Sequence, residues 1–273
     1  MSELVSCLCV SQPNRYALLQ RAILDYDAQT YEDKELIIVV DNPNYAAMID
    51  AFASEYRVED VSVITRPIKT QLDGLLFAGV HANGSIFVLW DDDNLNHPHR
   101  LKLQVATQMA NRSAVTVMSN GLYLFYRERQ LIAVDVVNPA LNAGRRTLPS
   151  SMMAYRQMWP VMDYRVRGKP SEAMVTNAAI AGRKIVAIRD HPFSHVVGVC
   201  GDNIRTEDYH RGVAQTNGLA SAEIEKAKTL LFETVLDTMR WDGPMSVEGR
   251  DKSIGTYTPK QTWPKTLYPI LVG

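Results

Sequence analysis

The apolar residues in the first third of the chain gather in short continuous runs, and the segments between them repeat apolar residues at helical spacing. Such runs are typical of strands buried on both faces of a parallel sheet. The predicted strands are residues 5–10, 35–40, 61–64 and 85–90. The predicted helices between them are residues 19–26, 45–56 and 71–82. This alternation predicts an α/β fold with a mostly parallel, doubly wound sheet that is flanked by helices.

The second half of the chain is less regular. Residues 114–119 and 122–126 are predicted to form a hairpin around Asn120-Gly121, because this dipeptide favours a tight turn. The other predicted elements are strands at 131–137 and 184–188 and helices at 152–158, 172–181 and 223–240. Prolines and aromatic residues are interspersed from Trp241 onward. We therefore expect a single domain over residues 1–240 and an extended C-terminal tail over 241–273.

Three consecutive aspartates follow the fourth predicted strand, where open α/β sheets bind ligands. In extended chain, Asp91 and Asp93 point to the same face, roughly 7 Å apart, while Asp92 points away. Carboxylates that converge in this way repel each other unless a cation lies between them. This repulsion predicts a divalent metal that holds a phosphorylated ligand. Asp41 ends the second strand at the same edge, which favours a site over the alternative, a solvated turn.

The composition narrows the class of protein. With 273 residues, 46% of them hydrophobic and 22% charged, the chain suits one globular domain or one domain with an added tail. A net charge of −1 gives no overall field that attracts nucleic acid or an anionic membrane, although it allows a local basic groove. The three cysteines form neither a zinc spacing nor a disulfide framework. We see no signal-peptide pattern and no apolar run of membrane-spanning length, so a cytoplasmic protein is expected.

Several motifs of the chain, taken in order, resemble one enzyme family. Residues 5–15, read together with 29–31 and 35–41, are similar to the start of family 2 glycosyltransferases, which have the GT-A fold. Residues 84–93, followed by 97–101, are similar to the acidic nucleotide-sugar motif of that family and to the helix after it. The resemblance covers residues 4–110 well and 111–210 loosely. It implies a transferase that uses a nucleoside diphosphate sugar as donor.

The resemblance also implies which residues bind this donor. They are Ser11, Gln12, Asp41, Arg66, Asp91 and Asp92. Ser11 or Gln12, together with Asp41, would contact the nucleotide base and the ribose. Arg66 would lie near the base. A UDP-sugar is the first expectation for the donor.

A Mn²⁺ or Mg²⁺ ion is implied as the cofactor. Asp93 would ligate it through the diphosphate, with Asp91 as the second candidate ligand, and Asp91 or Asp92 would bind the ribose or a metal-bound water. A hard, oxygen-ligated cation suits this chemistry because the leaving diphosphate must be neutralised. The family often has a histidine that joins the metal or the phosphates where this chain has Cys200. Either His195 or His210 replaces that histidine, or the metal lacks this ligand.

An inverting transfer also needs a general base beside the acceptor hydroxyl. The resemblance places this base at Glu172, and Asp163 is the second candidate. The family has an acidic pair at this place, whereas the first member here is Ser171. The alternative for Glu172 is a helix N-terminal acid that merely suits the helix dipole.

These expectations combine into a metal-dependent, inverting glycosyltransferase, with residues 1–110 as its nucleotide-sugar half and 111–240 as its acceptor half. The acceptor is not identified by the sequence. A sugar-phosphate nucleotidyltransferase shares the sheet, but it begins with a Gly-rich phosphate loop that residues 11–15 lack. The other alternative is a non-catalytic nucleotide-sugar-binding or scaffold protein of the same fold. The departures at Ser171 and Cys200 favour that alternative, and the intact aspartate triplet opposes it.

Overall fold

The computed structural model of the protein describes residues 3–135, 148, 150–161, 178, 181–188, 195–199, 204–226, 230–239, 241 and 243–260. The α-helices are α1 (Tyr16–Asp27), α2 (Pro43–Glu55), α3 (Gln71–His81), α4 (Arg100–Asn111), α6 (Ile204–Asn217) and α7 (Ser221–Lys226). The short 3-10 and π segments are η1 (Pro13–Arg15), η3 (Arg156–Val161), η4 (Leu230–Val235) and η5 (Leu236–Thr238). The strands are β1 (Val5–Val10), β2 (Lys34–Val40), β3 (Val61–Thr65), β4 (Ile86–Leu89), β5 (Leu95–Asn96), β6 (Val115–Met118), β7 (Asn120–Phe125), β8 (Gln130–Asp135), β9 (Met153–Tyr155), β10 (Ile185–Ile188), β11 (His195–Val199), β12 (Met245–Glu248) and β13 (Ser253–Tyr257).

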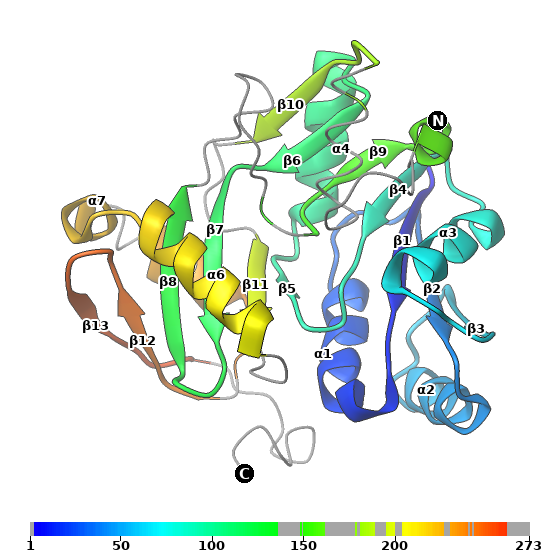
Figure 1. Ribbon diagram of the computed structural model, residues 1–273, viewed down its shortest axis with the longest axis horizontal. Helices are drawn as coiled ribbons and strands as arrows, with labels where there is room; N and C mark the ends of the chain where they lie inside the picture. The colour runs from blue at the N-terminus through cyan, green and yellow to red at the C-terminus, as the bar shows by residue number, and fades with distance from the viewer. Residues whose placement is uncertain are drawn as a thin grey trace.

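The described strands form two sheets, and the larger one is built mainly from the N-terminal half of the chain (Figure 1). Its order is β10-β6-β9-β4-β1-β2-β3. All of its pairs are parallel except those of β9, which lies antiparallel between β4 and β6. The α/β fold and the four N-terminal strands with their three intervening helices are therefore confirmed, with small shifts at their ends.

The continuous apolar runs are explained by burial on both faces of this sheet. In β2, Leu36 and Ile38 pack into one apolar cluster with residues of α1, α2 and α4. The alternate residues of the same strand, Ile37 and Val39, pack into a second cluster with residues of α3 and η3. Since successive side chains of a strand point to opposite faces, a strand covered on both sides needs apolar residues at every position.

The smaller sheet has the order β13-β12-β8-β7-β11-β5 and lies beside the first (Figure 1). One of its faces packs against α7, η4 and η5, and the other packs against α6. Strand β5 comes from the segment directly after the three aspartates, and it pairs with β11. The aspartate segment therefore lies where the two sheets meet.

The predicted hairpin around Asn120-Gly121 is wrong. Strand β6 belongs to the larger sheet and β7 to the smaller one, so the chain changes sheets at Ser119 instead of turning back. The hairpin of this region is β7–β8, two antiparallel strands. Gly121 serves close packing, because a Cβ atom there would lie 2.6 Å from the carbonyl oxygen of His195.

Two predicted helices are also corrected. Residues 152–158 form β9 and the start of η3, because β4 and β6 leave a place between them where a strand completes the hydrogen bonds of the sheet. The predicted helix 223–240 divides into α7, η4 and η5. The strands predicted at 131–137 and 184–188 are confirmed as β8 and β10. The predicted helix 172–181 falls outside the described residues, apart from the single residue Ala178.

The predicted extended tail needs a correction as well. Residues 245–257 form the antiparallel pair β12–β13, which joins the smaller sheet through β8. Trp241 is buried, and its indole nitrogen donates a hydrogen bond of 2.8 Å to the carbonyl oxygen of Leu236. Tyr257 donates one of 2.8 Å to Asp237. This part of the chain is thus integral to the fold, and residues 261–273 lie outside the described residues.

Candidate functional site

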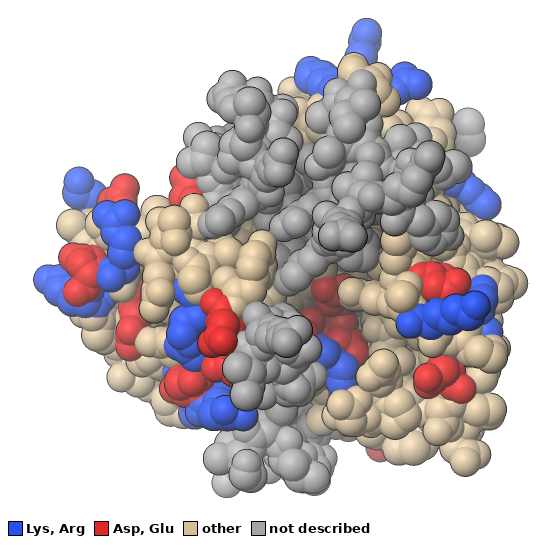
Figure 2. Space-filling model, viewed as in Figure 1, with Lys and Arg blue, Asp and Glu red and all other residues tan. Residues whose placement is uncertain are grey.

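A cavity of about 400 Å³ lies at the carboxyl ends of the central strands of the larger sheet. Its walls come from the segment after β1, the N-terminus of α3, the aspartate segment, and β11 and α6 of the second half. Figure 2 shows acidic and basic side chains together in a recess near the middle of that face of the molecule. The position agrees with the rule that open α/β sheets bind ligands at this edge.

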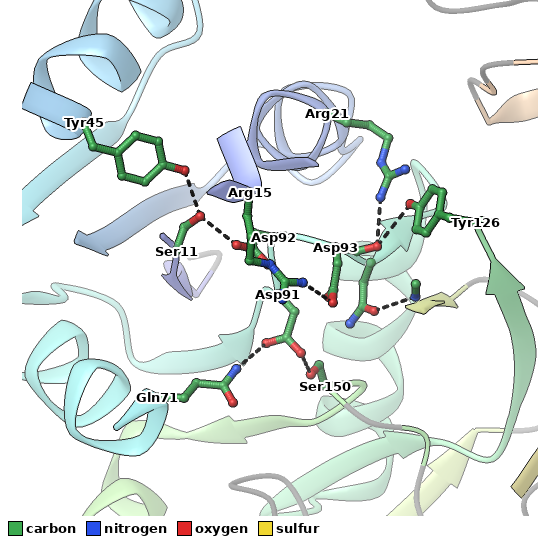
Figure 3. A network of polar contacts seen from close by, with 12 residues as sticks. Ser11, Arg15, Arg21, Tyr45, Gln71, Asp91, Asp92, Asp93, Tyr126 and Ser150 are labelled. Carbon is green, nitrogen blue, oxygen red and sulfur yellow. Dashed lines mark hydrogen bonds and ion pairs between the residues drawn. The ribbon is translucent and has the colours of Figure 1, made fainter. Parts of the chain in front are cut away.

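Asp92 is the buried member of the triplet, with 4% of its surface exposed. Ser11 donates a hydrogen bond of 2.6 Å to its Oδ2, and the Ser11 hydroxyl is also 2.9 Å from the hydroxyl of Tyr45 (Figure 3). Burial raises the pKa of Asp92 to about 7; Arg15 opposes this change and Asp93 adds to it. The environment of Asp92 thus disfavours the charged form of its own carboxyl group, and Arg15 offsets part of this effect.

Arg15 supplies the positive charge that this acidic cluster needs. Its Nε lies 2.9 Å from Oδ1 of Asp92, and its Nη2 pairs with Oδ2 of Asp93 (Figure 3). An extended chain would bring Asp91 and Asp93 together on one cation, but strand β4 ends at Leu89. The alternation of an extended chain therefore does not continue through the aspartates, and a guanidinium joins Asp92 to Asp93.

Asp91 lies toward a different part of the cavity wall. Its Oδ1 accepts a hydrogen bond of 3.3 Å from Gln71, the first residue of α3, and its Oδ2 accepts one from Ser150 (Figure 3). Ser150 has a φ of 57°, in the left-handed region, just before β9. The three neighbouring carboxylates are therefore held by three separate parts of the chain.

The main chain of Asp93 is fixed both from helix α1 and from the smaller sheet. Its carbonyl oxygen accepts hydrogen bonds of 2.8 Å from Arg21 Nη2 and 3.3 Å from the Tyr126 hydroxyl (Figure 3). The Arg21 guanidinium lies 5.0 Å from the centre of the Tyr126 ring. The backbone N–H of Gly198 in β11 donates a hydrogen bond of 3.0 Å to Asn94. Helix α1 and the second sheet thereby together position the residue expected to bind metal.

The other predicted donor-binding residues are placed differently. Ser11, Gln12 and Asp41 all line the cavity, together with the aspartates. Arg66 is not among the described residues that line it; its guanidinium lies 3.6 Å from Asp73 and 4.2 Å from the centre of the Phe77 ring.

The two candidate histidines are separated by the fold. His210, on α6, lines the cavity and is almost completely buried. His195 is buried in β11, with its Nδ1 3.1 Å from Oδ1 of Asn96, and it does not line the cavity. The predicted catalytic residues, Glu172 and Asp163, lie outside the described residues, as does Cys200.

Sequence reasoning missed Arg15, Arg21 and Tyr126. The signal for Arg15 was available, because a cluster of carboxylates at a buried sheet edge requires a positive charge. The sequence pattern alone predicts a metal for this role, whereas the protein itself provides a guanidinium. No sequence signal indicates Arg21 or Tyr126, because both act on a backbone carbonyl oxygen.

The oxygen atoms at the cavity suit a hard divalent cation that is shared with a ligand. In the described part of the chain, no group of three or more His, Cys, Asp and Glu side chains is arranged to hold a metal. Mg²⁺ is commonly bound by one or two carboxylates together with substrate phosphates and water. The carboxylates of Asp91 and Asp93, both partly exposed at the cavity, fit that kind of site.

The fold is of the GT-A type, and comparisons with solved structures agree. The S. aureus protein TarS, in complex with UDP, is similar over 72% of this chain and 60% of its own, with 15% identity and a TM-score of 0.53. The mannosyltransferase PcManGT from Pyrobaculum calidifontis, in complex with GDP-Man and Mn²⁺, is similar over 73% of this chain and 57% of its own, with 15% identity and a TM-score of 0.57. No curated protein matches the sequence significantly.

Residues 7–129 match the family described as Glycosyl transferase family 2. The matched segment contains most of β1, the aspartate triplet and Tyr126, so it includes most of the residues that build the cavity. The chain spans about 60% of the length of the solved TarS structure. None of the described helices combines the length and the apolar character needed to cross a membrane.

Proposed function

We propose that the protein transfers a sugar from a nucleoside diphosphate sugar to an acceptor hydroxyl, with a divalent cation bound and with inversion at the sugar. The observation that carries this proposal is the cavity of about 400 Å³ at the sheet edge, lined by the aspartate triplet, Ser11, Gln12 and Asp41. The complexes of TarS with UDP and UDP-GlcNAc, and of PcManGT with GDP-Man and Mn²⁺, support the class of donor.

The donor would lie along the edge formed by β1, β2 and β4. Ser11, Gln12 and Asp41 stand where the nucleoside would be held, because they follow the first two strands. Asp41 and Gln12 are exposed and can accept or donate hydrogen bonds to ribose and base. Arg66 is left out of this assignment because it pairs with Asp73 and is not among the residues that line the cavity.

The diphosphate would lie beside Asp93 and Asp91, which would hold Mn²⁺ or Mg²⁺. A cation bound there supplies a Lewis acid that neutralises the leaving diphosphate. His210 faces the same cavity from α6, and we assign it in preference to His195 as a contact for the phosphates or the acceptor. For the general base we keep Glu172 as the first candidate and Asp163 as the second.

The test is calorimetric binding of a panel of UDP-sugars and GDP-sugars in the presence of Mn²⁺, followed by an assay for the released nucleoside diphosphate. We expect Asp93→Ala to weaken donor binding on the order of 100-fold. Asp50→Ala, which changes an exposed acid on α2, should bind like the wild type and serves as the control. Glu172→Gln should retain donor binding and lose transfer.

Three results would count against the proposal. Absence of binding to every donor of the panel removes the enzyme function. Unchanged donor binding by Asp93→Ala removes the metal role of that residue. Formation of sugar 1-phosphate and a nucleoside triphosphate when pyrophosphate is added to the donor, in place of release of a nucleoside diphosphate, indicates a nucleotidyltransferase, because that class transfers the nucleotidyl group itself.

A further inference from the structure

The positive charge of Arg15 lies where two carboxylates of the site meet. One guanidinium nitrogen is 2.9 Å from Asp92, and another pairs with Asp93 (Figure 3). Arg15 also lines the cavity, and 22% of its side-chain surface is exposed. The same group can therefore contact the buried acid, the more exposed acid and a ligand in the cavity.

The two acids that Arg15 joins differ in how firmly they are held. Both oxygens of Asp92 are engaged, one by Arg15 and the other by Ser11, and its side chain is 6% exposed. The Asp93 side chain is 21% exposed. Arg21 and Tyr126 hold its carbonyl oxygen, which leaves rotation about the Asp93 side-chain bonds available. The Asp93 carboxylate is thus the member of this pair that can change partner.

A divalent cation on Asp93 would share that carboxylate with the guanidinium of Arg15. Two cations around one carboxylate repel each other strongly in a partly buried site. A guanidinium released from Asp93 has a natural acceptor in a diphosphate, because its planar set of donors matches phosphate oxygens in a bidentate manner. The arrangement favours an exchange of partners when a cation and a diphosphate enter together.

We propose that Arg15 is a resident counter-ion that yields Asp93 to the divalent cation and takes the diphosphate of the nucleotide in return, so that cation and diphosphate bind as a coupled pair. This inference rests on the proposed function, since it requires a cation and a nucleoside diphosphate in this cavity. In this proposal Arg15 and the cation compete for the carboxylate of Asp93. Without nucleotide, Arg15 opposes cation binding, and with nucleotide, Arg15 stabilises the complex of protein, cation and diphosphate.

The test measures Mn²⁺ affinity by electron paramagnetic resonance, with no nucleotide, with UDP or GDP and with uridine, after correction for Mn²⁺ bound to nucleotide in solution. For Arg15→Gln we expect Mn²⁺ alone to bind on the order of 10-fold more tightly than in the wild type, since its competitor is gone. We expect the nucleoside diphosphate to bind on the order of 10-fold more weakly at saturating Mn²⁺. Uridine should leave the Mn²⁺ affinity of the wild type unchanged.

Two further variants make the result specific. Arg15→Lys keeps the charge but not the planar set of donors, so both effects should appear with the same signs and smaller factors. It also provides the measurement if Arg15→Gln does not fold. Arg57→Gln removes an exposed arginine between α2 and β3, away from the ends of the strands that form the cavity, and should match the wild type within about twofold.

The opposite signs of the two effects separate this role from a structural one. If the Arg15 variants weaken Mn²⁺ and nucleotide together, or change neither, the exchange does not occur. Tightening of Mn²⁺ binding by uridine would also overturn it, because the diphosphate would not be needed. If the wild type binds neither Mn²⁺ nor UDP nor GDP, the proposed function itself fails.

Discussion

Gly198 of β11 packs directly against the main chain of Asp93. Its replacement by alanine tests whether the smaller sheet positions the aspartate segment. A Cβ atom at Gly198 would lie 2.9 Å from both the carbonyl carbon of Asp93 and a ring carbon of Tyr126, with the Asp93 carbonyl oxygen nearer still. Ordinary contacts of a Cβ atom begin at 3.4 Å. Relief of the overlap therefore requires a shift of roughly 1 Å in β11 or in the aspartate segment.

The loss of unfolding free energy depends on the contacts that this shift disturbs. The shift strains a close-packed contact and stretches the hydrogen bonds of Arg21 and Tyr126 to the Asp93 carbonyl oxygen. We expect Gly198→Ala to lose about 2–4 kcal/mol of unfolding free energy. For a chain of this size, that loss lowers the melting midpoint by about 5–15 °C. Donor binding should fall as well, because a displacement of about 1 Å at a reacting centre is costly.

The assay is thermal unfolding without ligand and with UDP plus Mn²⁺, since a ligand of the native state raises the midpoint. Gly212→Ala is the matched control, because a Cβ atom at this position within α6 meets nothing within 4 Å. It should stabilise the protein by about 0.5–1 kcal/mol through the loss of glycine flexibility. A Gly198→Ala protein that melts like the wild type and keeps the full ligand response would refute this account of the site.

Two further predictions concern ionisable groups. Burial alone would raise the pKa of Glu35, but hydrogen bonds from Ser6, Asn83 and Gly84 lower it. The Glu35 carboxylate therefore stabilises the fold above its usual pKa and loses that contribution as the pH falls. Glu35→Gln should therefore cost about 1–2 kcal/mol in urea unfolding at pH 7 and less at pH 3. The contribution of Asp92 to stability has the opposite pH dependence. Burial raises the pKa of Asp92 to about 7, so this contribution falls as the pH rises from about 4 to 7. Relative to the Asp92→Asn variant, the wild type should lose about 1 kcal/mol of unfolding free energy per pH unit across that range. A difference between the two proteins that stays constant with pH would contradict the effect of burial on Asp92.

The N-terminal half of the fold was predictable because its strands pair mainly with near neighbours in sequence. Strand β1 pairs with β2, and β2 with β3, each with one helix between them. Burial on both faces then makes each strand a continuous apolar run, which the periodicity reveals directly. Propensity, pattern and topology point to the same structure in this region.

The rest of the fold was not predictable from local patterns because its pairings join distant segments. Strand β9 finds its place only between β4 and β6, and β12 only beside β8. Asn120-Gly121 has the sequence of a tight turn, yet Gly121 is required by the neighbouring carbonyl oxygen of His195. Tertiary packing decided each of these positions against the local preference.

The candidate site shows the same division. The residues at strand ends, Ser11, Gln12, Asp41 and the aspartate triplet, were predictable because the carboxyl ends of parallel strands meet at one edge. The contacts of Arg15 with Asp93 and of Arg21 with the carbonyl oxygen of Asp93 join residues more than 70 positions apart. Only the folded chain shows which charged groups neutralise or orient the acids.

The three aspartates are adjacent in sequence but have different environments, and we expect them to have different roles. Asp92 has both oxygens engaged inside the protein, whereas Asp91 and Asp93 are partly exposed at the cavity. Neutralising a buried carboxylate with a raised pKa changes the free energy of unfolding, while an exposed ion pair contributes little to it. We therefore infer that neutralising Asp92 acts first on stability and that neutralising Asp93 acts first on what the cavity binds. Of the two residues that competed for the second role at the metal, the geometry favours Asp91.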